Sequence, residues 1–287
     1  MKKIFKLLFL FSLPLCLSGC LNNTNMEDID IYTTVYPVEY VTDYLYGEHS
    51  NILSIYPDGI NVNNFKLNDK QISDYSKASM YVFNGLGKEK DYVISMINNN
   101  DNLKIIDATS SMEYDYGIEE LWLDPSNLLM ISKNIDAGLL EYIDNGNKSQ
   151  DKINEKYEEL KIKLSELDAK IRLVAKASDN KTIIAGDKVF KYLEKYGFNV
   201  ICLDDNEVSD KTIYDVKELI TNGLNYIYVK DDSDLNDTVK YFQTNYDVKI
   251  TKLHSLANLS EEQRKNKDDY FTLMNDNINL LKESLYN

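Results

Sequence analysis

The chain has 287 residues, enough for two domains of ordinary size, each with a sizeable hydrophobic core. Hydrophobic residues make up 43% of it and charged residues 28%, which is the balance of a globular protein and not of a disordered chain. The net charge of −15 makes nucleic acid an unsuitable partner, because binding to phosphates requires a basic surface.

The N-terminus forms a segment of its own. Lysines flank an apolar run over residues 4–17, which is shorter than the ~20 residues that a transmembrane helix needs. This layout is typical of a signal peptide, predicted here over 1–19. The run ends in LSGC, which resembles the lipobox of bacterial lipoproteins, so we predict lipidation at Cys20 and a tether over 20–28. An ordinary signal peptide followed by an unrelated cysteine is the alternative.

From residue 29 on, short β-rich runs alternate with amphipathic segments. Strands are predicted over 29–36, 51–56, 79–85 and 103–107, and helices over 37–45, 68–77 and 89–97. Alternation of this kind predicts a parallel sheet with crossover helices. We therefore expect an N-terminal αβ lobe over residues 29–146.

The middle of the chain carries a different pattern, with apolar residues at strict four–three spacing and charges between them. The apolar positions are Ile153, Tyr157, Leu160, Leu164, Leu167, Ile171 and Val174. They predict one long helix over 147–177 with a narrow apolar seam, about 45 Å long at 1.5 Å per residue. The helix could form a coiled-coil dimer or lie across two lobes of one chain. Because the seam is short and lies between two αβ halves, the second explanation is favoured, and we expect a monomer.

Alternation then resumes to the C-terminus. Strands are predicted over 182–186, 198–203, 224–229 and 248–251, and helices over 187–196, 210–222, 233–245 and 260–285. The predicted fold class is thus α/β: two αβ lobes with parallel sheets of about four strands each, joined by one long rigid helix. The second lobe covers residues 178–287.

Five stretches of the sequence resemble the zinc and manganese solute-binding lipoproteins of bacterial ABC importers. They are IYTTVYPVEYVTDYLYGE, DYSKASMYVFNGLGKEKDYV, LWLDPSN, VFKYLEKYGF and the C-terminal stretch that begins LHSLANLS. The second is similar to the family's segment around NGLGLE, and the third to its VWLDP signature. The resemblance implies a lipid-anchored protein outside the cytoplasmic membrane, a ligand cleft between the lobes and an ABC permease as partner.

The resemblance also implies where a metal would bind. The usual ligands of the family are three histidines plus a histidine or carboxylate from the C-terminal lobe. The loop YPDGINVNNFKLND resembles the loop of the first histidine and places Asn63 there. Glu120 stands at the second position, two residues before Trp122, Asp187 at the third and Lys230 at the fourth. The two histidines of the chain, His49 and His254, fall outside these positions.

The residue types at these positions change the expected chemistry. Two carboxylates and an amide oxygen suit Mn²⁺, Mg²⁺ or Ca²⁺ better than Zn²⁺, which prefers nitrogen and sulfur. If Lys230 points into the cleft, its ammonium would pair with Glu120 and Asp187 and exclude a divalent ion. A third alternative leaves all four positions solvated. A divalent metal ion, zinc or manganese, is thus implied by the resemblance and opposed by the loss of the histidine ligands.

We therefore interpret the chain as the solute-binding lipoprotein of a metal ABC importer with a degenerate site. An enzyme is not expected, because no nucleophile with a neighbouring base and no glycine-rich phosphate loop is visible. The alternative is a non-transporting lipoprotein on the same fold that acts as an adhesin-like or partner-binding surface module.

Overall fold

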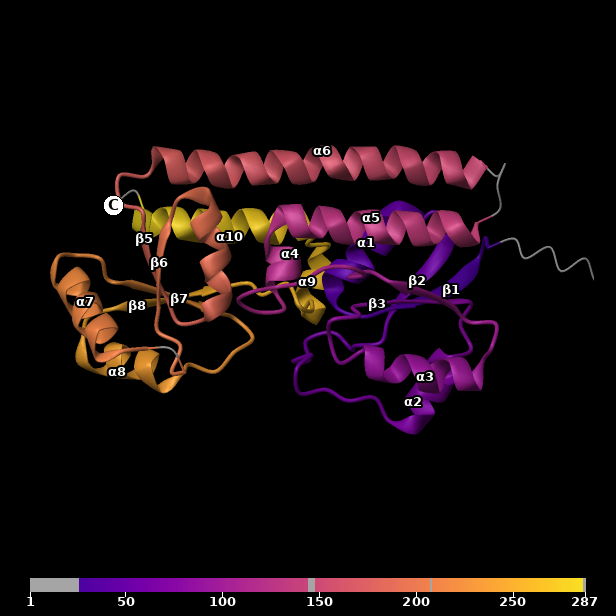
Figure 1. The fold of residues 1–287 in the computed structure, drawn as a ribbon, viewed down its shortest axis with the longest axis horizontal. Coiled ribbons are helices and arrows are strands. Elements are labelled where there is room, and N and C mark those ends of the chain that lie inside the picture. Colours follow the sequence, from indigo (N-terminus) through magenta and orange to yellow (C-terminus); the bar gives the residue numbers. More distant parts are fainter. Residues whose placement is uncertain (1–25, 144–147, 207, 286–287) are drawn as a thin grey trace, which may run out of the picture.

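The computed structural model describes residues 26–143, 148–206 and 208–285. Two αβ lobes lie side by side along one long helix (Figure 1). The predicted signal peptide over 1–19 and the predicted lipidation site Cys20 lie outside the described residues. Within the described ranges, no helix combines the length and apolar character needed to cross a membrane.

The N-terminal lobe contains a sheet of four parallel strands in the order β2–β1–β3–β4. The strands are β1 (Ile29–Thr33), β2 (Ser50–Ser54), β3 (Met80–Phe83) and β4 (Lys104–Asp107). The helices between them are α1 (Tyr36–Tyr46), α2 (Asp69–Tyr75) and α3 (Lys90–Asn99). All four residues of β3 are buried, as expected for a strand covered on both faces of a parallel sheet.

The C-terminal lobe repeats this topology, with the strand order β6–β5–β7–β8. Its elements are β5 (Thr182–Ala185), η1 (Lys188–Tyr196), β6 (Asn199–Cys202), α7 (Asp210–Thr221), β7 (Tyr226–Lys230), α8 (Asp237–Asn245) and β8 (Lys249–Leu253). In each sheet the order of the chain reverses between two central strands, β1 and β3 or β5 and β7. Open α/β sheets bind ligands at this switch point, beyond the carboxyl ends of the strands.

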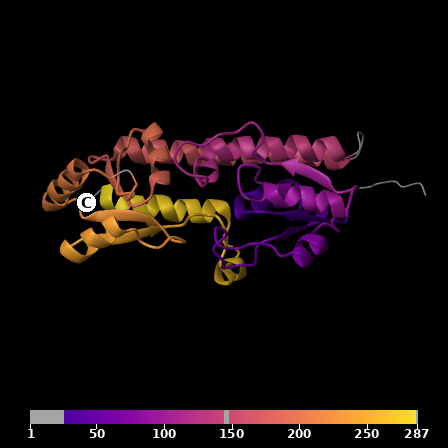
Figure 2. The ribbon, with the colours of Figure 1, turned by 60° about the horizontal axis from the view of Figure 1, so that its bottom comes forward.

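The long helix α6 (Lys148–Ala177) is continuous and spans both lobes (Figures 1 and 2). It contacts α1 and α5 on the N-terminal side, and η1 and α10 on the C-terminal side. Leu160, Leu164 and Ile171 of the predicted seam are buried. The prediction of one helix across both lobes is therefore confirmed, and the seam is used within one chain.

Three regions of the chain differ from the prediction. The alternation of strands and helices does not predict α4 (Glu120–Leu123) or α5 (Pro125–Tyr142), which follow β4. The helix predicted over 187–196 is a 3₁₀ helix. The helix predicted over 260–285 is two helices, α9 (Glu261–Asn266) and α10 (Tyr270–Leu285), because Lys267 takes a left-handed conformation that ends α9.

The segment between β8 and α10 returns to the N-terminal lobe. Arg264 forms a bidentate ion pair with Glu39 at 2.5 and 2.8 Å. Asn258 donates a hydrogen bond to the Pro57 carbonyl at 2.8 Å. The predicted C-terminal unit over 178–287 thus contains a stretch that packs on the other lobe, and the boundaries of the predicted units stay predictions.

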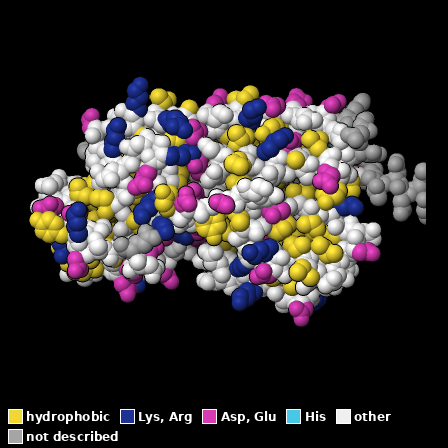
Figure 3. All heavy atoms as spheres, in the orientation of Figure 1, with side chains coloured by type: hydrophobic (Ala, Val, Ile, Leu, Met, Phe, Trp, Pro, Cys, Tyr) yellow, Lys and Arg dark blue, Asp and Glu magenta, His cyan; other side chains and the backbone are white. Residues whose placement is uncertain are grey.

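Basic side chains do not gather into one surface on the face shown in Figure 3. Lysines and arginines there are scattered among aspartates and glutamates over both lobes. This distribution agrees with the acidic net charge of −15.

Two leucines of α6 allow a matched test of its packing. Leu164 is 1% exposed and Leu173 is 64% exposed. We expect Leu164→Ala to lower the free energy of unfolding by about 2–5 kcal/mol, because it leaves a cavity at the helix seam. Leu173→Ala should change it by no more than about 0.5 kcal/mol. Urea unfolding measures both, and equal losses would contradict the packing described.

Candidate functional site between the lobes

The two switch points bring the candidate residues together. Asp187 follows β5, and Lys230 is the last residue of β7. On the N-terminal side, Asn63 lies in the loop after β2, and Glu119 directly precedes α4. Asn63 and Glu119 line one cavity of about 130 Å³.

An ion pair joins the lobes at this site. Lys230 Nζ lies 2.5 Å from Glu119 Oε1, and the two side chains are 13% and 7% exposed. Burial lowers the pKa of Lys230, but the neighbouring carboxylates of Glu119, Asp187 and Asp232 together outweigh it, so the pKa lies above its ordinary value. The lysine therefore stays a cation in the closed site.

The Asp187 side chain contacts the main chain of the same lysine. Its Oδ2 accepts a hydrogen bond from the Lys230 backbone N–H at 2.8 Å. Burial raises the pKa of Asp187, while this hydrogen bond and the lysine charge act in the opposite direction. Asp187 is thus a half-buried carboxylate that accepts a main-chain hydrogen bond and lies near one cation.

The structure corrects the position that follows from counting back from Trp122. Glu119, and not Glu120, meets Lys230. Glu120 Oε2 instead accepts hydrogen bonds from the backbone N–H groups of Asp115 (3.1 Å) and Tyr116 (3.0 Å). Residues three apart share a helix face, whereas residues two apart do not. Trp122 and Glu119 accordingly line the same cavity, but the sequence alone does not select Glu119 over Glu120.

The loop of Asn63 also connects the lobes. Asn63 is exposed, and its backbone N–H donates to Asn61 Oδ1 at 2.9 Å. Asn61 Nδ2 in turn donates to the Asp232 carbonyl at 2.8 Å. The structure thus places Asn63 in the lining of the cavity. It places Lys230 in contact with both Glu119 and Asp187.

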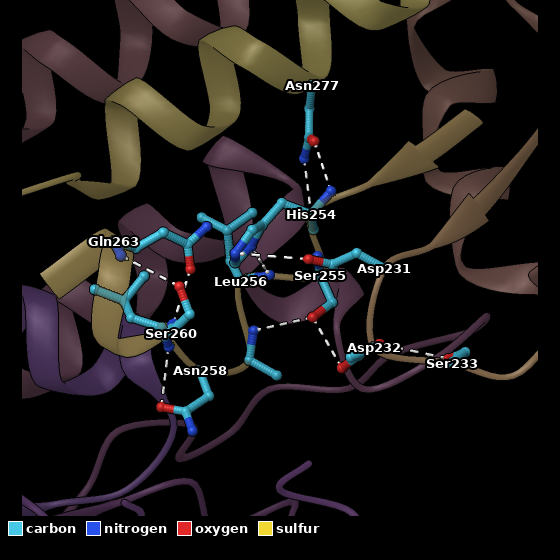
Figure 4. Close-up of polar contacts among 12 residues, drawn as sticks. Asp231, Asp232, Ser233, His254, Ser255, Leu256, Asn258, Ser260, Gln263 and Asn277 are labelled. Carbon is cyan, nitrogen blue, oxygen red and sulfur yellow. Dashed lines mark hydrogen bonds and ion pairs between the residues drawn. The ribbon is translucent and has the colours of Figure 1, made fainter. Parts of the chain in front are cut away.

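The remaining polar groups beside Lys230 are engaged in a network around β8 (Figure 4). Asp231 Oδ1 accepts from the Ser255 backbone N–H, and Asp232 Oδ2 accepts from the Ser255 hydroxyl, both at 2.8 Å. His254 Nδ1 accepts from the Leu256 backbone N–H at 2.9 Å, and its main chain is paired with Asn277. These hydrogen bonds hold the start of the segment between β8 and α10, which returns to the N-terminal lobe.

The donor set does not fit a transition metal. Within residues 26–143, 148–206 and 208–285, no group of three or more His, Cys, Asp or Glu side chains is placed to hold a metal ion. Lys230 is a donor only and cannot coordinate a metal while protonated. Zinc sites are built mainly from His and Cys, with Asp or Glu as additional ligands, and this group of residues contains neither His nor Cys.

A second buried carboxylate lines the cavity. Glu89 follows β3 and is 3% exposed. Its Oε1 accepts a hydrogen bond from the Tyr56 hydroxyl at 2.6 Å. Burial is the largest influence on the pKa of Glu89 and raises it, although the Tyr56 hydrogen bond and the Lys88 charge lower it. Sequence reasoning did not select Glu89, because a glutamate inside a motif carries no sign of its burial.

The geometry defines a class of protein: two α/β lobes of the same topology, with polar side chains meeting between the two switch points, form a two-lobed solute-binding fold. A family profile described as zinc-uptake complex component A, periplasmic, matches residues 31–284. The chain belongs to this family, which confirms the predicted family and the prediction of a solute-binding protein and not an enzyme.

Individual relatives are distant. The chain is 23% identical over 312 residues to the zinc-binding lipoprotein AdcA of Streptococcus pneumoniae strain R6, covering 99% of this chain and 61% of AdcA. It is 24% identical over 292 residues to the high-affinity zinc uptake system protein ZnuA of Bacillus subtilis, covering 90% of this chain and 88% of ZnuA. The chain thus spans about three fifths of AdcA.

Solved structures share the fold. The Zn(II)-bound ZnuA-like domain of S. pneumoniae AdcA superposes with a TM-score of 0.72 at 20% identity, over 91% of this chain and all of that domain. The metal-dependent lipoprotein YcdH of B. subtilis gives 0.72 at 20% identity, over 90% and 99% of the two chains. The predicted α/β fold with two lobes is confirmed.

The raised pKa of Glu89 predicts a pH dependence of stability. The folded state holds the proton more tightly than the unfolded state, so stability is greatest below the ordinary pKa near 4.5 and falls as the pH rises through the raised value. Glu89→Gln removes this dependence. The stability of the wild type relative to Glu89→Gln should therefore fall above pH ~4.5, by at most ~1.4 kcal/mol per pH unit.

Urea unfolding between about pH 4.5 and 7.5 measures this difference. The control is Glu113→Gln, which makes the same change at an exposed position. If the stability of the wild type relative to Glu89→Gln rises with pH over this range, the pKa of Glu89 is not raised by burial.

Proposed function

We propose that this protein is the extracytoplasmic solute-binding lipoprotein of a zinc/manganese-type ABC importer, and that a lysine replaces the metal in its interlobe site. The observation that carries the proposal is the buried pair of Lys230 and Glu119. It lies between the switch points of two lobes in a chain of the zinc-uptake family.

The replacement has a simple electrostatic basis. Carboxylates buried together are costly unless a cation lies among them. In a metal-binding relative a bound ion supplies that charge, whereas here the Lys230 ammonium supplies it covalently. A divalent ion would have to displace an ammonium held at 2.5 Å by Glu119. We therefore expect Asn63, Glu120 and Asp187 to give no high-affinity zinc site, in spite of their places in the sequence.

The expected partners follow from the family. We propose an ABC permease as the receiver of the solute and a lipid at Cys20 as the anchor outside the membrane, with the protein acting as a monomer. The name of the relative AdcA, a zinc-binding lipoprotein, supports the anchor. The adhesin-like alternative is not favoured by the comparisons.

Zinc calorimetry tests the site. The wild type should show no nanomolar Zn²⁺ binding, because the ligand set has no imidazole or thiolate and an ammonium occupies it. A repaired variant that combines Asn63→His, Glu119→His, Asp187→His and Lys230→Glu should gain Zn²⁺ affinity by at least about 100-fold, since three imidazoles and a carboxylate then converge.

A matched variant decides which glutamate belongs to the site. It carries Glu120→His in place of Glu119→His, with the other three changes kept. We expect this variant to gain much less affinity, because the Glu120 side chain is turned toward the 115–116 backbone. If it binds Zn²⁺ better than the Glu119→His combination, the site described here is misassigned. Nanomolar binding by the wild type would refute the replacement of the metal by Lys230.

Cell fractionation tests the anchor. The wild type should partition with membranes, and Cys20→Ala should be found uncleaved or released, because the lipid attachment point is gone. Cys202→Ala serves as the control, since it removes the cysteine of β6 and should not alter partitioning. A wild type that is free in the cytoplasm would show that the signal peptide and lipobox were misread.

A further inference from the structure

The short helix α4 is held at both of its ends by lysines of the C-terminal lobe. Glu119, which directly precedes α4, is paired with Lys230 of β7 at 2.5 Å. Asp124, which directly follows α4, is paired with Lys195 of η1, and the side chain of Asp124 is 8% exposed. The N-terminal lobe thus presents one turn of helix, and a lysine of the other lobe contacts it at each end.

The Lys195 end is connected to the long helix α6. Asp168 of α6 lies 3.7 Å from Lys195 Nζ and accepts a hydrogen bond from the Tyr196 hydroxyl at 2.7 Å. Arg172, one turn further along α6, donates to the other oxygen of Asp168 at 2.8 Å. Burial raises the pKa of Asp168, but these two hydrogen bonds and the charges of Lys195 and Arg172 outweigh it, so the pKa lies below its ordinary value. Lys195 therefore lies between two carboxylates, one from α6 and one at the end of α4.

The apolar core continues across the boundary between the lobes at the same place. Trp122 of α4 and Phe190 of η1 are each 2% exposed and belong to one hydrophobic cluster, and the two helices are in contact. A separation of the lobes at α4 would therefore expose apolar surface of both lobes and also break the ion pairs. A helix of four residues has little stability of its own, so the position of α4 depends on these neighbours.

We propose that α4 acts as a latch that fastens the N-terminal lobe to the C-terminal lobe. Lys230 holds the beginning of α4 and Lys195 holds its end, so the lobes separate there only when both ends are released. The inference goes beyond the proposed function, because it concerns how the lobes are held together and not which solute binds. It assigns Lys195, which lies outside the four positions that the sequence indicates, as a positioning residue of the site between the lobes.

The two ends of α4 are rigidly connected. Glu119 and Asp124 are separated by a single helical turn, in which the Leu123 backbone N–H donates to the Glu119 carbonyl at 2.8 Å. Asp124 also caps α5, because its carboxylate accepts a hydrogen bond from the Ser126 backbone N–H at 2.8 Å. If one end is released, the other end still holds the turn, so the two ion pairs act on one structural unit. Two unrelated ion pairs would instead open independently of each other.

Exchange of the Trp122 indole N–H with solvent reports the release of α4. Its Nε1 donates to the Ser255 carbonyl at 2.8 Å, and Ser255 is held by Asp231 and Asp232 of the C-terminal lobe (Figure 4). Because the chain contains one tryptophan, this group gives a single indole signal in the NMR spectrum of the protein. The rate of exchange follows the fraction of molecules in which this hydrogen bond is open.

We expect Lys195→Met and Lys230→Met each to speed this exchange at least about tenfold in the full chain, because each change leaves a buried carboxylate unpaired. The double variant should be faster by about the product of the two single effects, because the latch opens only when both contacts break. Lys161→Met, which removes an exposed pair with Glu158 on α6, should match the wild type. Lys195→Arg keeps the charge and should lie closer to the wild type than Lys195→Met does.

Exchange at the wild-type rate in either single methionine variant would overturn the proposal, and so would a double variant that is no faster than the faster single variant. If the double variant does not fold, the single variants decide. The buried backbone of β3, followed by mass spectrometry, reports global unfolding. An indole that exchanges no faster than β3 in the methionine variants, relative to the intrinsic rates, would also contradict a local release of α4. None of these outcomes bears on the proposed function, which zinc calorimetry tests separately.

Discussion

The buried ion pair between Glu119 and Lys230 constrains how the two lobes can be positioned relative to each other. Two charges taken out of water are stable only when they meet, so each lobe must present its partner at a fixed place. Other contacts across the boundary hold that geometry: Trp122 Nε1 donates to the Ser255 carbonyl at 2.8 Å, and Asn61 reaches the main chain of Asp232. An error in the relative position of the lobes would leave a buried carboxylate and a buried ammonium unpaired. The pair thus makes the closed arrangement a requirement of the charge balance.

The two lobes can meet this requirement because they share one topology and one long helix. Both sheets are parallel with equivalent strand orders, so each places the carboxyl ends of its two central strands toward a polar edge. The α6 helix packs on both lobes, and the segment after β8 returns to the N-terminal lobe, where Arg264 pairs with Glu39. Two connections of this kind limit relative movement of the lobes more than a single flexible linker would.

Much of this architecture is visible in the sequence, because apolar periodicity reports which face of an element is buried. The long helix follows from its four–three seam. The prediction missed the α5 helix, although its sequence carries the signals of a helix. These are Asp124 as the N-cap, Pro125 in the first turn and apolar residues on one face: Leu128, Ile131, Ile135 and Leu139. The 3₁₀ form of η1 is different, since a pattern over nine residues is too short to distinguish 3.0 from 3.6 residues per turn. Counting in sequence also fails at Glu120, because neighbours on a helix point in different directions and only the three-dimensional arrangement selects Glu119.

The proposed replacement of the metal by Lys230 has a consequence for the charge balance of the site. One ammonium carries half the charge of a divalent ion and can neutralise only one of two carboxylates. In the structure, the Lys230 ammonium pairs with Glu119. The backbone N–H of Lys230 donates a hydrogen bond to Asp187. A cation that is attached to the chain does not dissociate, so this ion pair does not depend on the concentration of a solute. Glu89 is a further buried carboxyl of the cavity lining, and burial raises its pKa although the Tyr56 hydroxyl donates a hydrogen bond to it.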